Sequence, residues 1–383
     1  MIIGIDASRA FGTARTGTEN YSYHLITHML RLTEARKHQF VLFVRAKTIT
    51  PSELIRSGVQ IVEIKLPYLW TQVGLAAATW QHKLDILWVP AHTLPILRNP
   101  RVRTVVTIHG LEYEWLPEYR NWFQRWYLPL STQYAVGNAD SLIAVSKFTQ
   151  KQLVNRLNAD IKRINVIHEG VDFGKSASRF MDTSSRQKVL NSWKLHDKGY
   201  ILFVGTIQPR KNLAFLIEVY AQIDLQLRKQ SKLVIAGSQG WMAEEVYLAP
   251  QIYGVSENVV FTGRVSEEEL KALYQGALVY VQPSITEGFG LPVLEAMASL
   301  VPVVSSDGGA LPEVVGNAGL VLPVCDNQNP NQKSVIVAKW VDGLTKVLSN
   351  PRLRERLIAA GKWRLREFGW DVAARSTLDY LVK

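Results

Sequence analysis

Two glutamates lie eight positions apart across the junction between a loop and an expected helix. Glu287 falls in a loop after the apolar run 278–282, and Glu295 falls inside the helix that should start near Gly290. Glycines at 288 and 290 let a backbone approach a ligand closely. A helix start also offers free N–H groups and a positive dipole end to a phosphate. Two carboxylates there could accept hydrogen bonds from a sugar and a ribose. The alternative is an ordinary turn followed by a solvated helix residue.

A pair of adjacent cations follows another apolar run. Arg210 and Lys211 stand beyond the run 200–204 and a turn at 208–209. Arginine supplies a planar fork of donors and lysine supplies a point charge, so the pair suits a diphosphate. We expect both side chains to be exposed at the mouth of a cleft. An exposed basic turn without a ligand explains the pair, taken alone, nearly as well.

Glycine-containing loops follow two more apolar runs. Residues 305–319 contain Gly308 and Gly309 before an expected helix, and this loop either closes the floor of the same pocket or is a structural turn. In the first half, Gly17 precedes a helix and could direct backbone N–H groups toward a phosphate. The stretch around Gly17 lacks the G-x-G-x-x-G pattern, which counts against an NAD-binding domain.

His109 closes an apolar run, VVTIH, at the end where a catalytic side chain would stand. A structural role explains a lone histidine at least as readily.

The segment 111–129 is dense in aromatic residues and arginines. Several of its aromatic side chains recur at three- and four-residue spacing, which is typical of one helical face. We expect part of this face to lie in the core. An exposed remainder would suit a membrane interface or a sugar-stacking surface. The candidate contact residues are Trp115, Arg120, Trp122 and Arg125.

The chain alternates apolar strands with amphipathic helices from end to end, which predicts an α/β protein with parallel sheets. The polar, Ser-rich segment 173–188 is interpreted as a linker between two such domains. Each motif above follows a strand, where open parallel sheets bind ligands. The expected strands are 2–6, 40–44, 60–64, 86–89, 103–108, 141–144, 165–168, 200–204, 232–236, 259–262, 278–282, 301–305 and 319–322.

Composition excludes several classes of protein. Hydrophobic residues make up 47% of the chain and charged residues 20%, which is ordinary for a globular protein and excludes a disordered one. The single Cys325 excludes a disulfide framework, and no apolar run reaches the roughly 18 residues of a membrane span. The sequence begins directly with a strand-like run and resembles no signal peptide. These features indicate a cytoplasmic protein.

The net charge of +11 is concentrated in the first half of the chain. Residues 1–180 hold 22 Lys and Arg against 13 Asp and Glu, whereas residues 181–383 hold 22 against 20. Such asymmetry suggests an anionic partner, either a phosphate-bearing substrate, a lipid headgroup or nucleic acid. We find no recognition helix or ribonucleoprotein motif, so nucleic acid is disfavoured.

Together the motifs resemble the retaining glycosyltransferases of the fourth family, which have the GT-B fold and include bacterial mannosyl- and glucosyltransferases. The resemblance covers nearly the whole chain, and the spacing of Glu287 and Glu295 matches the family's E-x7-E signature. It rests on IGIDASR, TGTENY, VTIH, LIAVSKFT, VIHEGVD, VGTIQPRKN, VVFTGRVS, EGFGLPVLEAMA and SSDGGALPEVVGNAG.

The resemblance implies two Rossmann-like domains that face each other across a deep cleft. Residues 1–178 would bind the acceptor, with the C-terminal helix 368–383 packing back on them. Residues 179–367 would bind the nucleotide-sugar donor.

It also implies a role for each site residue. Glu295 would hold the ribose, Glu287 the donor hexose, and Arg210 and Lys211 the diphosphate, with His109 on the transferred sugar. The sequence reads Gly110 where many relatives have an aspartate after this histidine, so an acidic neighbour of His109 is in doubt. The remaining donor contacts would be Gly290, Leu291, Gly17, Gly263 and Arg264.

The implied reaction moves a hexose from a UDP- or GDP-sugar to a glycan or lipid-linked saccharide, with retention of anomeric configuration. The chain contains no Asp-x-Asp triplet, so we expect neither a metal nor another cofactor. Fixed cations and a helix start would stabilise the leaving diphosphate instead. A nucleotide-sugar epimerase and a non-catalytic nucleotide-sugar-binding protein are the alternatives. Peripheral contact with the inner face of an anionic membrane is a further expectation.

Overall fold

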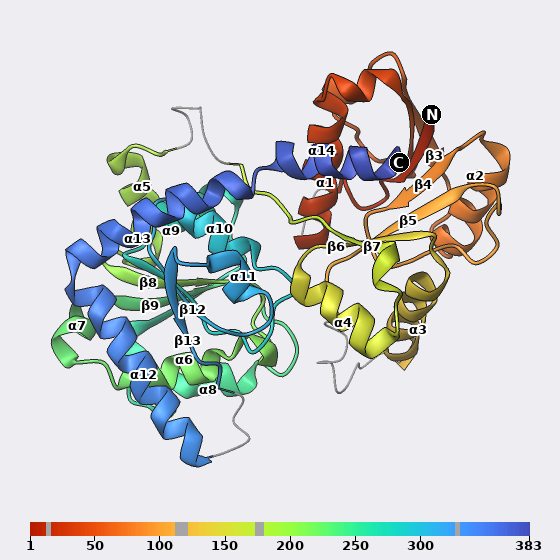
Figure 1. The fold of residues 1–383 in the computed structure, drawn as a ribbon. Coiled ribbons are helices and arrows are strands. Elements are labelled where there is room, and N and C mark those ends of the chain that lie inside the picture. Colours follow the sequence, from red (N-terminus) through yellow and green to blue (C-terminus); the bar gives the residue numbers. More distant parts are fainter. Residues whose placement is uncertain (13–16, 112–121, 173–179, 326–329) are drawn as a thin grey trace. The chain divides into compact units, whose positions relative to one another are not determined.

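The computed structural model describes residues 1–12, 17–111, 122–172, 180–325 and 330–383. The chain divides into two compact units, and each is described by itself (Figure 1). Unit 1 comprises Met1–Gly170 together with Phe368–Lys383, and unit 2 comprises Val171–Glu367. Each unit is built around one parallel sheet.

Unit 1 contains a seven-stranded sheet in the order β3-β2-β1-β4-β5-β6-β7. All of its strand pairs are parallel. The order reverses between β1 and β4, so the loops after these two strands leave toward opposite faces of the sheet. The strands are β1 (Ile2–Asp6), β2 (Gln39–Arg45), β3 (Val59–Ile64), β4 (Ile86–Val89), β5 (Arg103–Ile108), β6 (Ser141–Ala144) and β7 (Ile164–Val166).

The central strands of unit 1 are buried on both faces, as expected for a parallel sheet covered by helices. In β2, Val41 and Phe43 belong to a core cluster with Trp70 and Leu75, while Phe40 and Leu42 are buried toward the other face. The helices are α1 (Gly17–Arg31), α2 (Ala76–Gln81), α3 (Trp122–Asn138), α4 (Lys147–Leu157) and α14 (Trp370–Leu381).

The last helix, α14, packs against α1 within unit 1. Trp370 stacks on His24 with ring centroids 5.2 Å apart and an interplanar angle of 8°. One turn along α1, His28 Nδ1 lies 2.7 Å from a carboxylate oxygen of Asp371. A Cβ on Gly170 would lie 2.6 Å from the backbone nitrogen of Trp370, so the chain leaves unit 1 pressed against the start of α14.

Unit 2 contains a six-stranded parallel sheet in the order β10-β9-β8-β11-β12-β13. Its order reverses between β8 and β11. The strands are β8 (Tyr200–Val204), β9 (Lys232–Ala236), β10 (Val259–Gly263), β11 (Val279–Gln282), β12 (Val303–Ser306) and β13 (Gly319–Leu322).

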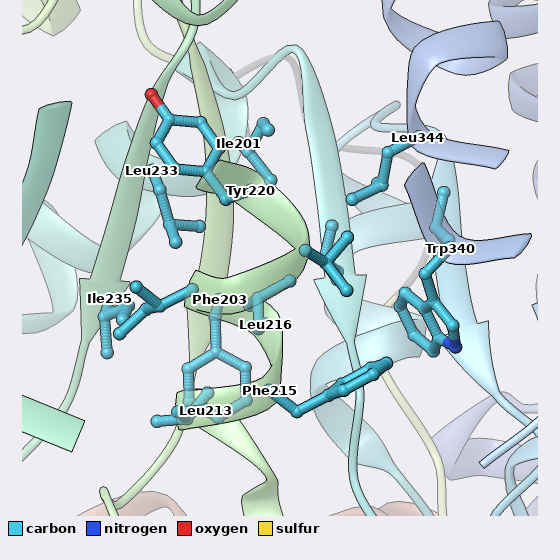
Figure 2. Close-up of a cluster of buried hydrophobic side chains, with 14 of the residues drawn as sticks. Ile201, Phe203, Leu213, Phe215, Leu216, Tyr220, Leu233, Ile235, Trp340 and Leu344 are labelled. Carbon is cyan, nitrogen blue, oxygen red and sulfur yellow. The ribbon is translucent and has the colours of Figure 1, made fainter. Parts of the chain in front are cut away.

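Helices cover both faces of this second sheet (Figure 1). Figure 2 shows the core on one face, where Phe203 and Leu216 pack among aliphatic side chains and Phe215 meets Trp340 edge to face at 5.6 Å. The helices are α5 (Thr183–Leu190), α6 (Leu213–Ala221), α7 (Leu225–Gln230), α8 (Glu244–Ile252), α9 (Glu267–Gly276), α10 (Leu291–Ala298), α11 (Leu311–Val315), α12 (Pro330–Ser349) and α13 (Pro351–Arg364).

Every strand predicted from the sequence is present, with ends that differ by no more than a few residues. The predicted linker 173–188 is wrong in its second half, because α5 begins at Thr183. Asp182 caps this helix by accepting a hydrogen bond from the Ser185 backbone at 2.9 Å, and Arg186 pairs with Asp197 at 2.7 Å. Residues 173–179 lie outside the described residues. Within the part of the chain that the structure covers, no helix combines the length and apolarity needed to cross a membrane.

Candidate active site

The loops after β8 and β11 meet where the strand order of unit 2 reverses, which is where open parallel sheets bind ligands. Arg210 and Lys211 lie on a single 3₁₀ turn, Pro209–Lys211, that follows β8. The backbone N–H of Ile285, after β11, donates to the carbonyl of Arg210 at 2.8 Å and ties the two loops together. Asn212 ends the turn in a left-handed conformation with φ 55°.

Glu287 lies at the centre of this junction and holds both cations. Its Oε2 accepts a hydrogen bond from Arg210 at 2.7 Å, and its Oε1 accepts one from Lys211 Nζ at 2.5 Å. The same Oε1 also accepts hydrogen bonds from Gln282 Nε2 at 2.8 Å and from Ser284 Oγ at 2.7 Å. The carboxylate therefore fixes the positions of two cations with four hydrogen bonds.

The expected exposure of the two cations is wrong. Arg210 is 8% exposed, Lys211 is 7% exposed and Glu287 is 6% exposed. Arginine and lysine are buried only when they are paired, and the carboxylate supplies that pairing. Desolvation acts to raise the pKa of Glu287, but the charges of Arg210 and Lys211 outweigh it and hold the pKa well below its ordinary range. The cluster thus carries one carboxylate and two cations, with a net positive charge.

The loop after β12 supports Glu287 through its backbone. Gly309 has φ 66°, and a Cβ there would lie 2.4 Å from both the backbone nitrogen and the carbonyl oxygen of Glu287. A Cβ on Gly308 would lie 2.4 Å from the carbonyl oxygen of Ile285. The N–H of Ala310 donates to the Glu287 carbonyl at 2.9 Å. The two glycines therefore allow a close backbone approach that holds the Glu287 loop in place.

Helix α10 starts directly after this loop. Gly290 caps it with φ 112°, and Leu291 is its first residue. Glu295, one turn into the helix, accepts a hydrogen bond from the Tyr274 hydroxyl at 2.7 Å. Desolvation raises the pKa of Glu295 above its ordinary value, and the bond from Tyr274 offsets part of this rise.

Three other expected donor contacts lie at the ends of elements. Gly263 ends β10 with φ 68° at an irregularity in the pairing with β9, and Arg264 beside it is exposed. Gly17 is the first residue of α1 in unit 1 and is exposed. Their roles toward a nucleotide stay predictions.

In unit 1, His109 follows β5 and lies between two hydrogen-bond acceptors. Its Nδ1 lies 2.8 Å from Glu169 Oε1, and its Nε2 lies 2.9 Å from the carbonyl oxygen of Pro90. A neutral imidazole carries only one N–H and cannot donate to both. A neutral His109 ring can therefore donate to only one of these two acceptors. An acidic side chain does stand beside His109, and it comes from another loop.

His92 stands beside this pair, with its ring centroid 5.7 Å from that of His109. Burial lowers the pKa of His92 to about 3, and the charges of His109 and Arg9 act in the same direction. His92 is therefore neutral near physiological pH. Tyr21, from α1, meets His109 edge to face at 4.5 Å.

Sequence reasoning missed five residues that build these two clusters. His92, Gln282 and Ser284 stand at or just after the end of a strand and Glu169 lies in a quoted motif, which is the signal that could have found these four, whereas Tyr274 lies inside α9 without such a signal. Glu169 falls within VIHEGVD, for example, but nothing in one sequence shows that this motif reaches His109. The five are His92, Glu169, Tyr274, Gln282 and Ser284.

The aromatic segment is described only in part. Trp115 and Arg120 lie outside the described residues, and Trp122 and Arg125 fall in the first turn of α3, where the backbone alone is described. Their expected contacts with an acceptor or a membrane stay predictions.

Two family profiles match the chain, one on each unit. The family "Glycosyl transferases group 1" matches residues 185–364, and "Glycosyltransferase Family 4" matches residues 15–175. The O-antigen chain mannosyltransferase B of Escherichia coli is 31% identical over 280 residues, which cover 72% of this chain and 69% of that protein. The chain belongs to the group 1 glycosyltransferases. The resemblance inferred from the sequence is confirmed.

Other similar proteins agree with this assignment. The D-inositol 3-phosphate glycosyltransferase of a Nocardioides species is 33% identical over 265 residues, covering 65% of this chain and 55% of that protein. The sucrose-phosphate synthase of Thermosynechococcus elongatus has the same fold, with a TM-score of 0.75, 20% identity and 99% and 98% of the two chains covered. The lipopolysaccharide glycosyltransferase WaaG gives a TM-score of 0.70 at 14% identity, covering 100% of this chain and 99% of that one. The predicted GT-B fold is thereby confirmed, and this glycosyltransferase has a parallel α/β architecture in both units.

Proposed function

We propose that this glycosyltransferase moves a hexose from a nucleoside-diphosphate sugar to a growing saccharide chain, with retention of anomeric configuration and without a metal ion. The observation that carries the proposal is the buried cluster of Arg210, Lys211 and Glu287 at the strand-order reversal of unit 2.

The chemistry of the leaving group motivates the first step. Departure of a nucleoside diphosphate builds negative charge on its phosphate oxygens. Arg210 and Lys211 are already oriented by Glu287, so they can stabilise this charge without reorganising. Because the cluster is shielded from water, each charge interaction is stronger than it would be at the surface. The start of α10 adds backbone N–H groups nearby.

The two glutamates take different parts in this proposal. Glu295 offers a carboxylate to the ribose hydroxyls and exchanges its bond from Tyr274 for bonds from the nucleotide. Glu287 holds the two cations in position. The side of its carboxylate that they leave open would face the donor hexose. Gly290, Leu291, Gly263, Arg264 and Gly17 would supply further donor contacts, and His109 would face the transferred sugar.

The acceptor proposal draws on the relatives. Two Escherichia coli proteins that the chain resembles are named as an O-antigen chain mannosyltransferase and a serotype-specific mannosyltransferase. A solved GT-B neighbour, HepE of Anabaena, contains UDP-glucose, with a TM-score of 0.64. These names favour a mannosyl or glucosyl donor and a glycan or lipid-linked saccharide as the acceptor.

A nucleotide-sugar screen tests the reaction. The protein is incubated with UDP-glucose or GDP-mannose, with and without lipid-linked saccharide acceptors, and the products are measured by mass spectrometry. We expect nucleoside diphosphate to form together with a product one hexose longer. An epimerase would convert the donor without any acceptor, and a binding protein would convert nothing. Proton NMR of the new glycosidic bond reports retention.

Excess chelator tests the metal-free step. We expect turnover to persist, because two fixed cations take the place of a metal. Lys211→Met should abolish most of the turnover, whereas Lys229→Met, which removes an exposed cation of α7 in the same unit, should leave it unchanged. Loss of activity in chelator that magnesium restores would overturn the metal-free proposal.

A further inference from the structure

One face of unit 1 exposes apolar side chains that no other described element covers. The π-helical turn Trp70–Leu75 runs directly into α2, and its outward positions Val73, Ala77 and Trp80 recur at helical spacing. All three are exposed, and Trp80 is 61% exposed. The opposite face is also apolar and belongs to the core through Trp70, Leu75 and Ala78. A helix that is apolar all round is normally buried on every side.

A neighbouring loop extends this exposed surface. Trp80 Nε1 donates to the carbonyl of Leu97 at 3.2 Å, and the Gln72 side chain accepts from the N–H of Ile96 at 3.0 Å. The loop is thus held beside the helix with its apolar side chains outward, since Ile96 is exposed and Leu97 is 77% exposed. We call Val73, Ala77, Trp80, Ile96 and Leu97, together with Tyr68 and Leu69, the apolar face.

The start of the helix adds a strained residue to the apolar face. Leu69 has φ 53° and ψ 28°, a left-handed conformation that is unfavourable for leucine. Its side chain is 65% exposed, so packing within the protein covers only a small part of it. Tyr68 beside it is 84% exposed. Strain of this kind persists at positions where a contact requires it.

The two segments that carry the apolar face hold basic residues and no acidic ones, and the exposed acids Glu63 and Asp85 stand just outside them. Segments 65–83 and 91–103 contain no aspartate or glutamate. Lys65, Lys83 and Arg101 in these segments are exposed. A second copy of this basic chain would not be attracted by such a rim, whereas an anionic lipid surface would. Tryptophan and tyrosine among basic and aliphatic residues are also typical of a membrane interface.

We propose that the apolar face docks unit 1 on an anionic lipid bilayer, with Leu69, Trp80 and Leu97 entering the headgroup region and Lys65, Lys83 and Arg101 contacting the lipid phosphates. This surface is distinct from the segment 111–129 considered from the sequence. The inference deepens the membrane contact expected from the sequence, and its test uses no sugar substrate, so its failure would leave the proposed transfer reaction untouched.

Co-sedimentation of the full chain with vesicles tests the docking. Vesicles of phosphatidylcholine alone are compared with vesicles of phosphatidylcholine and phosphatidylglycerol in equal parts. We expect binding to the anionic vesicles and a loss of at least about tenfold in partitioning on Leu97→Asp, which places a charge where an apolar side chain would insert. Ile161→Asp is the matched control, because Ile161 is also exposed but precedes β7 at the far edge of the sheet.

The basic rim and the insertion are tested separately. Lys65→Glu and Arg101→Glu should each lower partitioning about fivefold or more at low salt, because each cation near an anionic leaflet contributes about that factor. A polarity-sensitive fluorophore on Leu97→Cys should report a less polar environment when anionic vesicles are added. The native Cys325 is buried and does not compete for the label.

Three outcomes would overturn the proposal. Equal recruitment to neutral and anionic vesicles, or unchanged recruitment of Leu97→Asp, would show that this face does not dock on anionic lipid. A concentration-dependent dimer in sedimentation velocity that Leu97→Asp dissociates would show that a second copy covers the face instead.

Discussion

Glu287 is buried and Glu295 is half-buried in the same loop and helix, yet their surroundings are opposite. Glu287 is held by two cations, a serine hydroxyl and a glutamine amide, and its pKa is lowered. Glu295 has the Tyr274 hydroxyl as its recorded partner, and desolvation raises its pKa. Two glutamates of the same sequence motif therefore differ in their hydrogen-bond partners and in the direction in which their pKa is shifted.

We call Glu287 the organising carboxylate, because it holds Arg210 and Lys211, and Glu295 the binding carboxylate, because it could hold a ligand directly. The oxygens of Glu287 are committed to the cations, so its main effect on a ligand is indirect, through Arg210 and Lys211. Among the described residues, Glu295 has the neutral Tyr274 hydroxyl as its hydrogen-bond partner, which a ribose could replace. The His109–Glu169 pair of unit 1 is a third arrangement, in which a carboxyl group contacts one nitrogen of a neighbouring imidazole.

The largest expected effect comes from removing the organising carboxylate. Glu287→Ala would leave Arg210 and Lys211 buried without a counter-charge, and loss of one partner from a buried ion pair costs about 3–5 kcal/mol. We expect a large loss of unfolding free energy in urea together with loss of turnover. Loss of turnover with unchanged stability is the result expected if the two cations were exposed, and it would contradict their burial.

A double variant keeps this prediction testable even if Glu287→Ala folds poorly. Lys211→Met in the background of Glu287→Gln removes one of the two uncompensated cations. We expect it to recover part of the stability, with a coupling energy of about 0.5–3 kcal/mol between the two sites. Purely additive effects would show that the ion pair does not organise the loop.

A smaller effect is expected for the binding carboxylate. Glu295→Gln should weaken the affinity for a free nucleoside diphosphate about tenfold to a hundredfold, because a charged hydrogen bond contributes about 1.5–3 kcal/mol. Isothermal titration calorimetry measures this, with Glu267→Gln on the neighbouring helix α9 as an exposed control. Unchanged affinity in Glu295→Gln would remove Glu295 from the nucleotide site.

Glu169→Gln sharpens the comparison with unit 1. The amide oxygen can still accept a hydrogen bond from His109 Nδ1, but the ionisable carboxyl group is gone. We expect kcat/KM to fall about fivefold, since a charged hydrogen bond exceeds a neutral one by about 1 kcal/mol. Nitrogen-15 NMR of the His109 ring should show a changed Nδ1 resonance in the variant, because a neutral amide replaces the carboxyl group that lies 2.8 Å from this nitrogen in the native protein. A purely structural role would lower stability without moving this resonance.

The smallest effect is a difference in how stability depends on pH. The stabilisation from Glu287, whose folded pKa is lowered, is present above its unfolded value of 4.5 and is lost as pH falls. The contribution of Glu295, whose folded pKa is raised, is present below 4.5 and is lost as pH rises through the folded value. Glu295→Gln should therefore gain stability relative to the native protein as pH increases from 4.5. If the unfolding free energies of the native protein and of Glu295→Gln changed in parallel with pH, this result would contradict the raised pKa of Glu295.

The strands and the loops that carry the site could be predicted from the sequence, because buried parallel strands are continuous apolar runs and ligand sites follow their carboxyl ends. Arg210, Lys211 and Glu287 were found in this way. Their mutual pairing was not, since it depends on which strands are neighbours, and β8 and β11 are far apart in the chain. The burial of both cations follows from that pairing.

The same limit explains the other missed contacts. Glu169 follows β7 and His109 follows β5, so their meeting requires two loops to converge over the sheet. The helix α5 was missed for a different reason. Its residues are polar and lack an apolar stripe, so the only local signal was the capping Asp182.

Unit 2 is continuous in the chain, whereas unit 1 is made of two pieces, 1–170 and 368–383. In genetic terms unit 2 is an insertion, placed at a point where Gly170 already touches the start of α14. A deletion that ends the chain at Glu367 would therefore remove α14 from its contact with α1. It would damage unit 1, although unit 2 is the part of the chain next to the deletion. Conversely, a short peptide joining Gly170 to Phe368 would excise unit 2 and leave unit 1 whole. Modular exchange of unit 2 between related enzymes thus requires two junctions at one place in the fold.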